Sequence, residues 1–173
     1  MDREAALALM RAKAPKTNLQ KHMLAVEAVM RAVARRFGQD EELFGLVGLL
    51  HDLDYEETVN MAEEHGRRAA DELVRLGYPA EVAAAVRAHC PANTERASLL
   101  DRALHAVDPL TGLIVASALI TPAKSLSAID GGFVLNRMGE KGFARGANRD
   151  QIRSCADFGL ALSDLLALGV RAM

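Results

Sequence analysis

The sequence predicts an all-α protein, folded as a compact bundle of helices. Half of its 173 residues are hydrophobic, with many Ala, Leu and Val, whereas aromatic residues make up only 4%. This balance suits packed helices better than β-sheets. Apolar residues also recur at spacings of three and four, as they do on one face of an α-helix. A chain of this length can bury a core of its own, so we expect one domain spanning 1–173.

The first three helices are marked by polar residues at their starts and glycine at a stop. Segment 3–13 has helical periodicity and forms a short leading helix. Thr17 or Asn18 can cap a long helix that ends at Gly38. Asp40 caps a third helix with almost no polar face, so we expect that helix to lie at the centre of the fold.

Further helices follow in the middle of the chain. We expect one over about 61–76 and another from Pro79 to the break at Pro91. Thr94 is a candidate cap for the next helix, which leads towards the apolar run 110–120. These helices complete a core of about 18–119.

Glycines divide the remaining residues, 120–173, into short helices and turns that form an extension of the core. Asn148 with Gln151 resembles a capping box. Ser163 is the expected cap of a last helix over 164–171.

Charge, cysteine content and hydropathy exclude several classes of protein. The formal net charge is -2, so a broad basic face for duplex nucleic acid is not expected. Cys90 and Cys155 lie far apart without a CxxC spacing, which indicates reduced thiols and a cytoplasmic protein. The longest apolar run, 110–120, is shorter than a membrane span.

Four of the five histidines and two aspartates lie on, or at the ends of, the apolar stripes. A buried charge or imidazole without a partner costs several kcal/mol, roughly, and a shared metal would satisfy the whole set. Any one of these histidines alone fits an ordinary core residue, but the ordered set favours a metal site. His105 is instead expected to be a surface or supporting residue. The six candidate ligands are His22, His51, Asp52, His65, His89 and Asp108.

The order of these six residues resembles the H…HD…H…H…D pattern of the HD superfamily of helical, metal-dependent phosphohydrolases. The resemblance covers about 18–119 and is most specific in Gly-Leu-Leu-His-Asp-Leu-Asp-Tyr, residues 48–55. One departure is Leu53-Asp54, where the better-known subgroup has Ile-Gly. Residues 143–150 also look like a tail found in small, uncharacterised bacterial members.

The resemblance implies a role for each ligand. The primary metal would be held by His22, His51, Asp52 and Asp108. His65 and His89 would complete a second metal site or face the substrate phosphate, and Asp52 would bridge two metals if both bind.

Four neutral imidazoles and two carboxylates around two divalent ions leave a charge of about +2, which attracts an anion. Mixed nitrogen and oxygen ligands suit Mn, Fe, Co, Ni or Zn, and Mg stays open. A metal-bound water could then attack phosphorus, with Asp108 or Asp54 orienting it. The candidate phosphate-binding residues are Lys21, Arg67, Arg68, Lys124 and Arg145.

We therefore expect an enzyme that cleaves a phosphoester or phosphoanhydride bond in a small molecule, first of all a nucleotide. A second reading is a sensor or adaptor that keeps the metal site with little or no turnover. A third is a lyase or oxygenase that uses two irons. Dimerisation through an apolar helix face also stays open.

Overall fold

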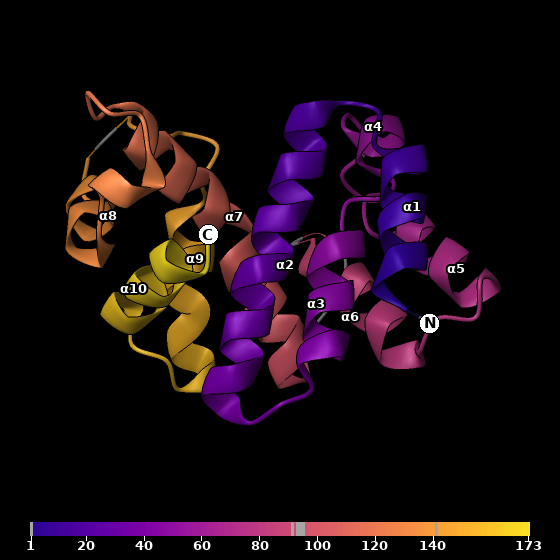
Figure 1. Ribbon diagram of the computed structural model, residues 1–173. Coiled ribbons are helices and arrows are strands. Elements are labelled where there is room, and N and C mark those ends of the chain that lie inside the picture. The colour runs from indigo at the N-terminus through magenta and orange to yellow at the C-terminus, as the bar shows by residue number, and fades with distance from the viewer. Residues whose placement is uncertain (1, 91, 93–95, 141) are drawn as a thin grey trace.

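The computed structural model describes residues 2–90, 92, 96–140 and 142–173, and every regular element in them is helical (Figure 1). This confirms the all-α prediction. The elements are α1 (Arg3–Lys13), α2 (Thr17–Phe37), α3 (Glu41–Leu50), α4 (Tyr55–Thr58), α5 (Arg67–Arg75), α6 (Ala80–His89), α7 (Leu99–Leu119), the 3-10 helix η1 (Leu126–Ala128), α8 (Gly131–Met138), α9 (Arg149–Arg153), the 3-10 helix η2 (Ser154–Phe158) and α10 (Leu162–Ala172).

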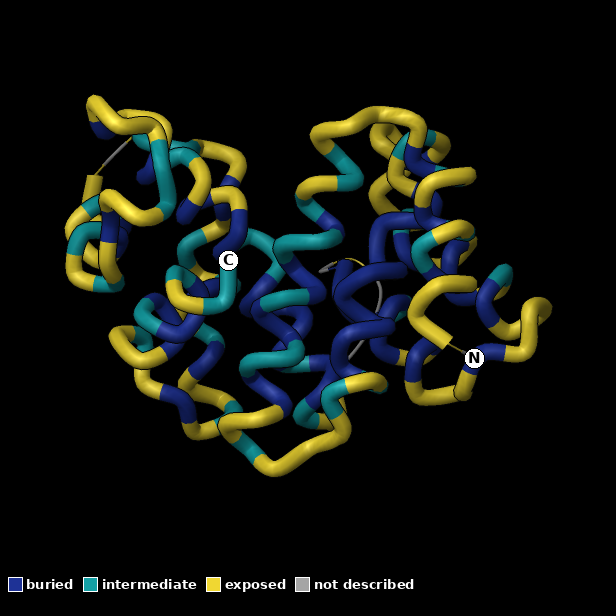
Figure 2. The backbone as a smooth tube through the Cα atoms, viewed as in Figure 1, coloured by how far each residue is buried: buried dark blue, intermediate teal, exposed yellow. Residues whose placement is uncertain are grey.

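Helices α2 and α7 form the middle of the fold. Helix α7 packs against α2, α3 and α6, and also against α8, α9 and α10. In Figure 1, α8 and α10 lie on one side of this pair, and α1, α5 and α6 lie on the other. Figure 2 shows the buried residues concentrated between these layers. Among the described helices, none is both long and apolar enough to cross a membrane.

Gly48 lets helix α3 approach α2 closely. A Cβ at Gly48 would lie 2.8 Å from the Cα and N atoms of Glu27, so only glycine allows this approach without a shift. Residues 44–50 are all buried, and the Asp40 side chain caps the start of α3, as expected. The close contact places the end of α3, and with it His51, against α2.

A buried carboxylate ties α1 to α2. Glu27 is 3% exposed, and it accepts hydrogen bonds from Arg3 Nε at 2.5 Å and Arg31 Nε at 3.1 Å. Arg31 also donates two hydrogen bonds to Glu42 at the start of α3. Because a buried charge needs a partner, this network fixes α1, α2 and α3 relative to one another.

The prediction of a helix over about 61–76 is wrong at its start, because α5 begins only at Arg67. Gly66 has a φ of 76°, in the left-handed region, which interrupts a continuous helix. Met61 is consequently exposed instead of lying on an inward face. His65 lies in the turn before α5 and still points inward.

The start of α7 differs from the expected position. Thr94 lies outside the described residues. Ser98 caps α7, because its side chain accepts from the N–H of Asp101 and the Asp101 side chain accepts from the N–H of Ser98. The helix continues through Pro109, which has no N–H to donate to the carbonyl of His105.

Two caps were expected in the last third of the chain. Asn148 accepts from the N–H groups of Asp150 and Gln151, so the predicted cap of α9 is confirmed. The cap at Ser163 is wrong, because α10 already starts at Leu162 and Ala161 occupies the cap position without a side-chain bond. Ala161 is exposed, so water can satisfy the free N–H groups there.

The variant Gly48→Ala should push α3 away from α2, and such overpacking costs about 1–3 kcal/mol. We expect urea unfolding to show a loss of that size in the free energy of unfolding. Gly112→Ala in α7 is the matched control, since nothing lies within 4 Å of a Cβ there. That change should stabilise the helix by about 0.5–1 kcal/mol. Equal effects of the two changes would contradict the close packing at Gly48.

Candidate metal centre

The structure brings together all six side chains that the sequence marks as ligands, from five separate segments. His22 comes from α2, and His51 and Asp52 follow the end of α3. His65 precedes α5, His89 ends α6, and Asp108 lies in α7. Their ligand atoms form two groups, each with all its atoms within 4.8 Å of one another. The first group is His22, His51 and Asp108, and the second is Asp52, His65 and His89.

In the first group, the Nε2 atoms of His22 and His51 are 3.2 Å apart. Asp108 Oδ1 lies 3.1 Å from His22 Nε2 and 3.8 Å from His51 Nε2. The second group repeats this arrangement. The Nε2 atoms of His65 and His89 are 3.1 Å apart, and Asp52 Oδ1 lies 3.3 and 3.7 Å from them, respectively.

The carboxylate of Asp52 connects the two groups. Its Oδ1 faces His65 and His89, whereas its Oδ2 lies 3.6 Å from His22 Nε2 and 3.5 Å from His51 Nε2. One oxygen therefore faces each group. This is the placement that a carboxylate shared between two cations requires.

The opposite ring nitrogens of His51 and His89 are held by the backbone. His51 Nδ1 lies 2.9 Å from the carbonyl oxygen of Gly48, and His89 Nδ1 lies 2.5 Å from that of Val86. A carbonyl oxygen only accepts hydrogen bonds, so both rings carry a proton on Nδ1.

The other two histidines are held in the same way by side chains. His22 Nδ1 lies 3.1 Å from the hydroxyl of Thr111, which itself donates to the carbonyl of Asp108 at 3.0 Å. His65 Nδ1 lies 3.0 Å from Asp54 Oδ1. Because the Thr111 proton is already used, both rings donate from Nδ1.

When they are neutral, all four rings would present an Nε2 lone pair to the centre. Two such lone pairs 3.1 or 3.2 Å apart repel each other unless a proton or a metal cation lies between them. Hydrogen bonding at the far ring nitrogen is also the usual way in which proteins orient metal-binding histidines. The donor set thus fits two divalent cations.

The pKa values show the same demand for positive charge. Burial alone would raise the pKa of Asp52 and Asp108, but the neighbouring histidines outweigh burial and lower both. Burial opposes protonation of His51, yet Asp52 and Asp108 raise its pKa to about 9. Burial also opposes protonation of His65, yet Asp52 and Asp54 raise its pKa to about 10. Protons and cations therefore compete for this site.

Asp54 is buried and acts on His65. Besides His65 Nδ1, its carboxylate accepts from the N–H of Gly66 at 3.2 Å and of Ala69 at 2.9 Å, which caps α5. Burial raises the pKa of Asp54, but these donors outweigh it and lower the pKa. Asp54 does not line the cavity at the centre. The expected role of Asp54 in orienting water stays a prediction, and its contacts in the structure are with the His65 ring and the start of α5.

His105 lies outside both groups. It is buried, and its Nδ1 is 3.1 Å from the carbonyl oxygen of His89. Burial lowers its pKa, so the ring stays neutral near pH 7. This is the supporting position that the sequence suggested as one of two alternatives.

A cavity of about 470 Å³ opens at the metal centre. Four of the ligands, His22, Asp52, His65 and Asp108, line it, and the half-exposed ring of Tyr55 lies edge-on to His65 at 5.7 Å between ring centroids. Its lining also includes Lys16, Asn18, Leu19, Glu56 and Gly146.

The five lysine and arginine residues expected to bind phosphate are all exposed, and none lines this cavity. Lys21 lines an adjoining groove, and Arg145 lines a different hollow. Arg68 pairs with Glu64 at 3.2 Å. Arg67 precedes it at the start of α5, and Lys124 lies in the turn after α7.

Sequence reasoning missed several residues at the centre, Lys16 and Thr111 among them. Lys16 lines the cavity and pairs with Glu56 at 2.6 Å, and its signal was its place just before the helix of His22. Thr111 holds His22, and its signal was the spacing of three from Asp108 on the same helix.

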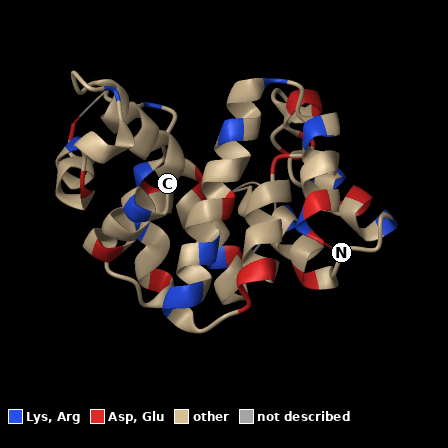
Figure 3. Cartoon of the chain, in the orientation of Figure 1, with Lys and Arg blue, Asp and Glu red and all other residues tan. Residues whose placement is uncertain are grey.

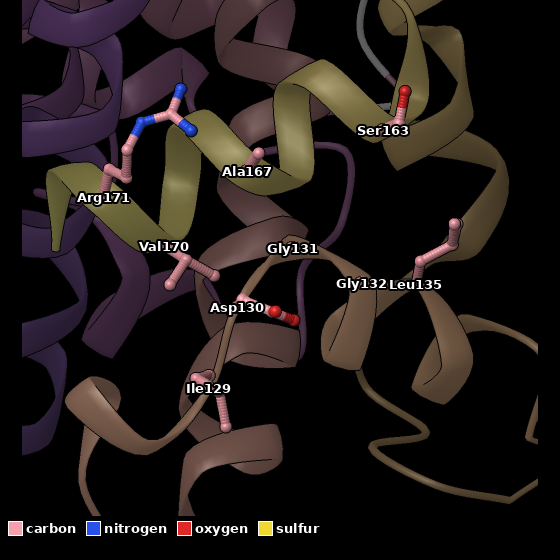
Figure 4. Close-up of a pocket in the computed structure, with 9 residues that line it drawn as sticks. All are labelled: Ile129, Asp130, Gly131, Gly132, Leu135, Ser163, Ala167, Val170 and Arg171. Atoms are coloured by element: carbon pink, nitrogen blue, oxygen red, sulfur yellow. The ribbon is translucent and has the colours of Figure 1, made fainter.

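Another hollow lies between α8 and α10, and none of the six candidate ligands lines it (Figure 4). Its lining contains no histidine, and its Asp130 already caps α8 by accepting from the N–H of Phe133 at 2.7 Å. A Cβ at Gly131 would lie 2.8 Å from Ala167 in α10, so the two helices touch here.

Figure 3 shows no broad basic face in its view, because Lys and Arg alternate with Asp and Glu.

The variant Asp54→Asn tests the positioning of His65. The amide is a weaker acceptor, so cation affinity at the second group should fall about 10–100-fold while the first group keeps its affinity. Calorimetric titration with Mn²⁺ would resolve the two steps. Glu57→Gln, an exposed carboxylate in the same segment, is the control. An equal loss at both steps would contradict the assignment.

The variant Thr111→Val tests the other group, because it removes the acceptor for His22 Nδ1 with little change in shape. Cation affinity at the first group should fall by at least about tenfold, and Thr111→Ser should restore it. Competition with a chelator would measure both. A valine variant with unchanged affinity would show that Thr111 does not orient His22.

A known protein family matches this chain. The family model of the HD domain matches residues 19–117, which is more than half of the chain and contains all six candidate ligands. Comparison with curated proteins and with solved structures gave no match. HD domains bind divalent metals and define a superfamily of metal-dependent phosphohydrolases. The chain belongs to the HD-domain family, as its ordered histidines and aspartates predict.

Proposed function

We propose that this protein is a metal-dependent phosphohydrolase that cleaves a phosphoester or phosphoanhydride bond in a small molecule. The observation that carries the proposal is the pair of close Nε2 contacts bridged by Asp52. The first group offers two imidazoles and oxygens of Asp108 and Asp52, and the second offers two imidazoles and an oxygen of Asp52. Both leave coordination positions for water and substrate.

The donor chemistry fits a pair of transition-metal cations. Nitrogen and oxygen donors together suit Mn, Fe, Co, Ni or Zn better than Mg. His22, His51 and Asp108 would hold one cation, His65 and His89 the other, and Asp52 would serve both. When bound, the cations would supply a water of lowered pKa and neutralise charge on the phosphoryl group.

The chain's own residues would position the substrate and the attacking water. The Asp108 side chain is 29% exposed and lines the cavity, so its carboxylate can orient an attacking water by accepting a hydrogen bond from it. Lys16, which lines the cavity, would attract the phosphate. Asp52 fixes the two histidine groups relative to each other, and Asp54 keeps His65 in place.

The substrate fits the small-molecule class. A cavity of about 470 Å³ falls within the range of small-molecule sites, roughly 300–1,000 Å³. A nucleotide is the first class to test, because its phosphates suit a site with excess positive charge. Cys90 and Cys155 are free and buried, which supports the proposal of a reducing, cytoplasmic setting. A homodimer remains a further proposal.

The variant Asp52→Ala should remove cations from both groups, because each loses its share of the bridging carboxylate. Phosphate release should fall at least about 100-fold, with the helical circular dichroism retained. Elemental mass spectrometry and a phosphate assay on a nucleotide and phosphoester panel would measure both effects. Glu57→Gln is the control.

Two results would change the proposed function. Wild-type protein that stays metal-free after Mn, Fe, Co, Ni and Zn are each supplied would contradict the metal centre. Metal-loaded protein that binds nucleotides, with a raised melting temperature but no phosphate release, would be a sensor instead of an enzyme.

A further inference from the structure

A groove of about 420 Å³ lies between α2 and α7, directly beside the cavity at the metal centre. The two hollows share Asn18 and His22 in their linings. A molecule whose phosphate lies at the metal centre can therefore extend into the groove past His22. We call this hollow the α2–α7 groove.

The α2–α7 groove has a mainly apolar lining on its α7 side. Ala25 comes from α2, and Val115 and Leu119 come from α7; the latter two are 41% and 56% exposed. No Phe, Tyr or Trp is among the lining residues, and the imidazole of His22 already contacts Thr111 and His51. The polar lining residues Asn18 and Lys21 lie on α2, and the Thr111 hydroxyl already contacts His22 and the carbonyl of Asp108.

The groove is open because residue 112 is glycine. Gly112 lies in the middle of α7, where glycine destabilises a helix relative to alanine. A Cβ at this position would meet no atom within 4 Å, so packing within the protein does not require a glycine. A larger side chain here would instead occupy the groove.

We propose that the α2–α7 groove binds the organic group of the substrate, and that this group is apolar and aliphatic. The substrate would then be an alkyl-type phosphate ester, with its phosphate at the metal centre and its chain along Ala25 and Val115 towards Leu119. This rests on the proposed function for the placement of the phosphate. It narrows the substrate class away from nucleotides, which would bind mainly through their phosphates.

The test uses the Mn²⁺-loaded protein and a series of non-hydrolysable alkylphosphonates from methyl to hexyl, titrated by calorimetry. In the wild type, each added methylene should lower the dissociation constant by up to about fourfold. Gly112→Leu should weaken hexylphosphonate at least tenfold and leave methylphosphonate unchanged. Ala84→Leu, at an exposed position of α6, is the matched control and should behave like the wild type.

Three results of the binding titrations would overturn the inference. The first is wild-type affinity that does not depend on chain length, which includes a failure of every phosphonate to bind. The second is an equal effect of Gly112→Leu on methyl- and hexylphosphonate. The third is a nucleoside monophosphate that binds more tightly than hexylphosphonate and loses this advantage in Gly112→Leu.

Turnover and self-association separate this inference from its neighbours. Chain-length-dependent binding without phosphate release from alkyl phosphates would refute the proposed enzyme and support the groove. Gly112→Leu that changes the elution volume in size-exclusion chromatography, with phosphonate binding unchanged, would show that the groove is a contact between copies and overturn the inference.

Discussion

The structure of the centre depends on hydrogen bonds at the outer nitrogens of four histidines. Each Nδ1 donates to an acceptor of the protein, which directs each Nε2 inward. The two close Nε2 pairs are unfavourable unless positive charge lies between them. The fold therefore holds the two Nε2 pairs where a cation can bind between them, and Asp52 and Asp108 add carboxylate ligands to this site.

The two helix ends at the centre use one local device. His51 follows the last residue of α3, His89 is the last residue of α6, and each donates to the carbonyl three residues earlier. Carbonyls in the last turn of a helix lack helical partners, so these bonds satisfy them and fix the rings together. The negative ends of both helix dipoles also face the centre, which favours a cation there.

The sequence predicted the parts of this site that have a local signal. The apolar periodicity of α2, α3 and α6 places His22, His51 and His89, and the ordered pattern identifies the family. It did not reveal that Asp54 caps α5 and holds His65, because that bond depends on the left-handed turn at Gly66, twelve residues away. A regular pattern over 61–76 suggested one continuous helix, but the turn at Gly66 lets the helix begin only at Arg67.

The candidate metal ligands and the groove that we propose for the organic group of the substrate lie on different parts of the helices. The ligands come mainly from helix ends and turns, where backbone acceptors fix them, whereas the α2–α7 groove is formed by exposed faces of two long helices. A side chain in the middle of α7, such as that at position 112, can change without disturbing a hydrogen bond at the centre. The groove is therefore where substrate choice could vary at least cost to the metal site.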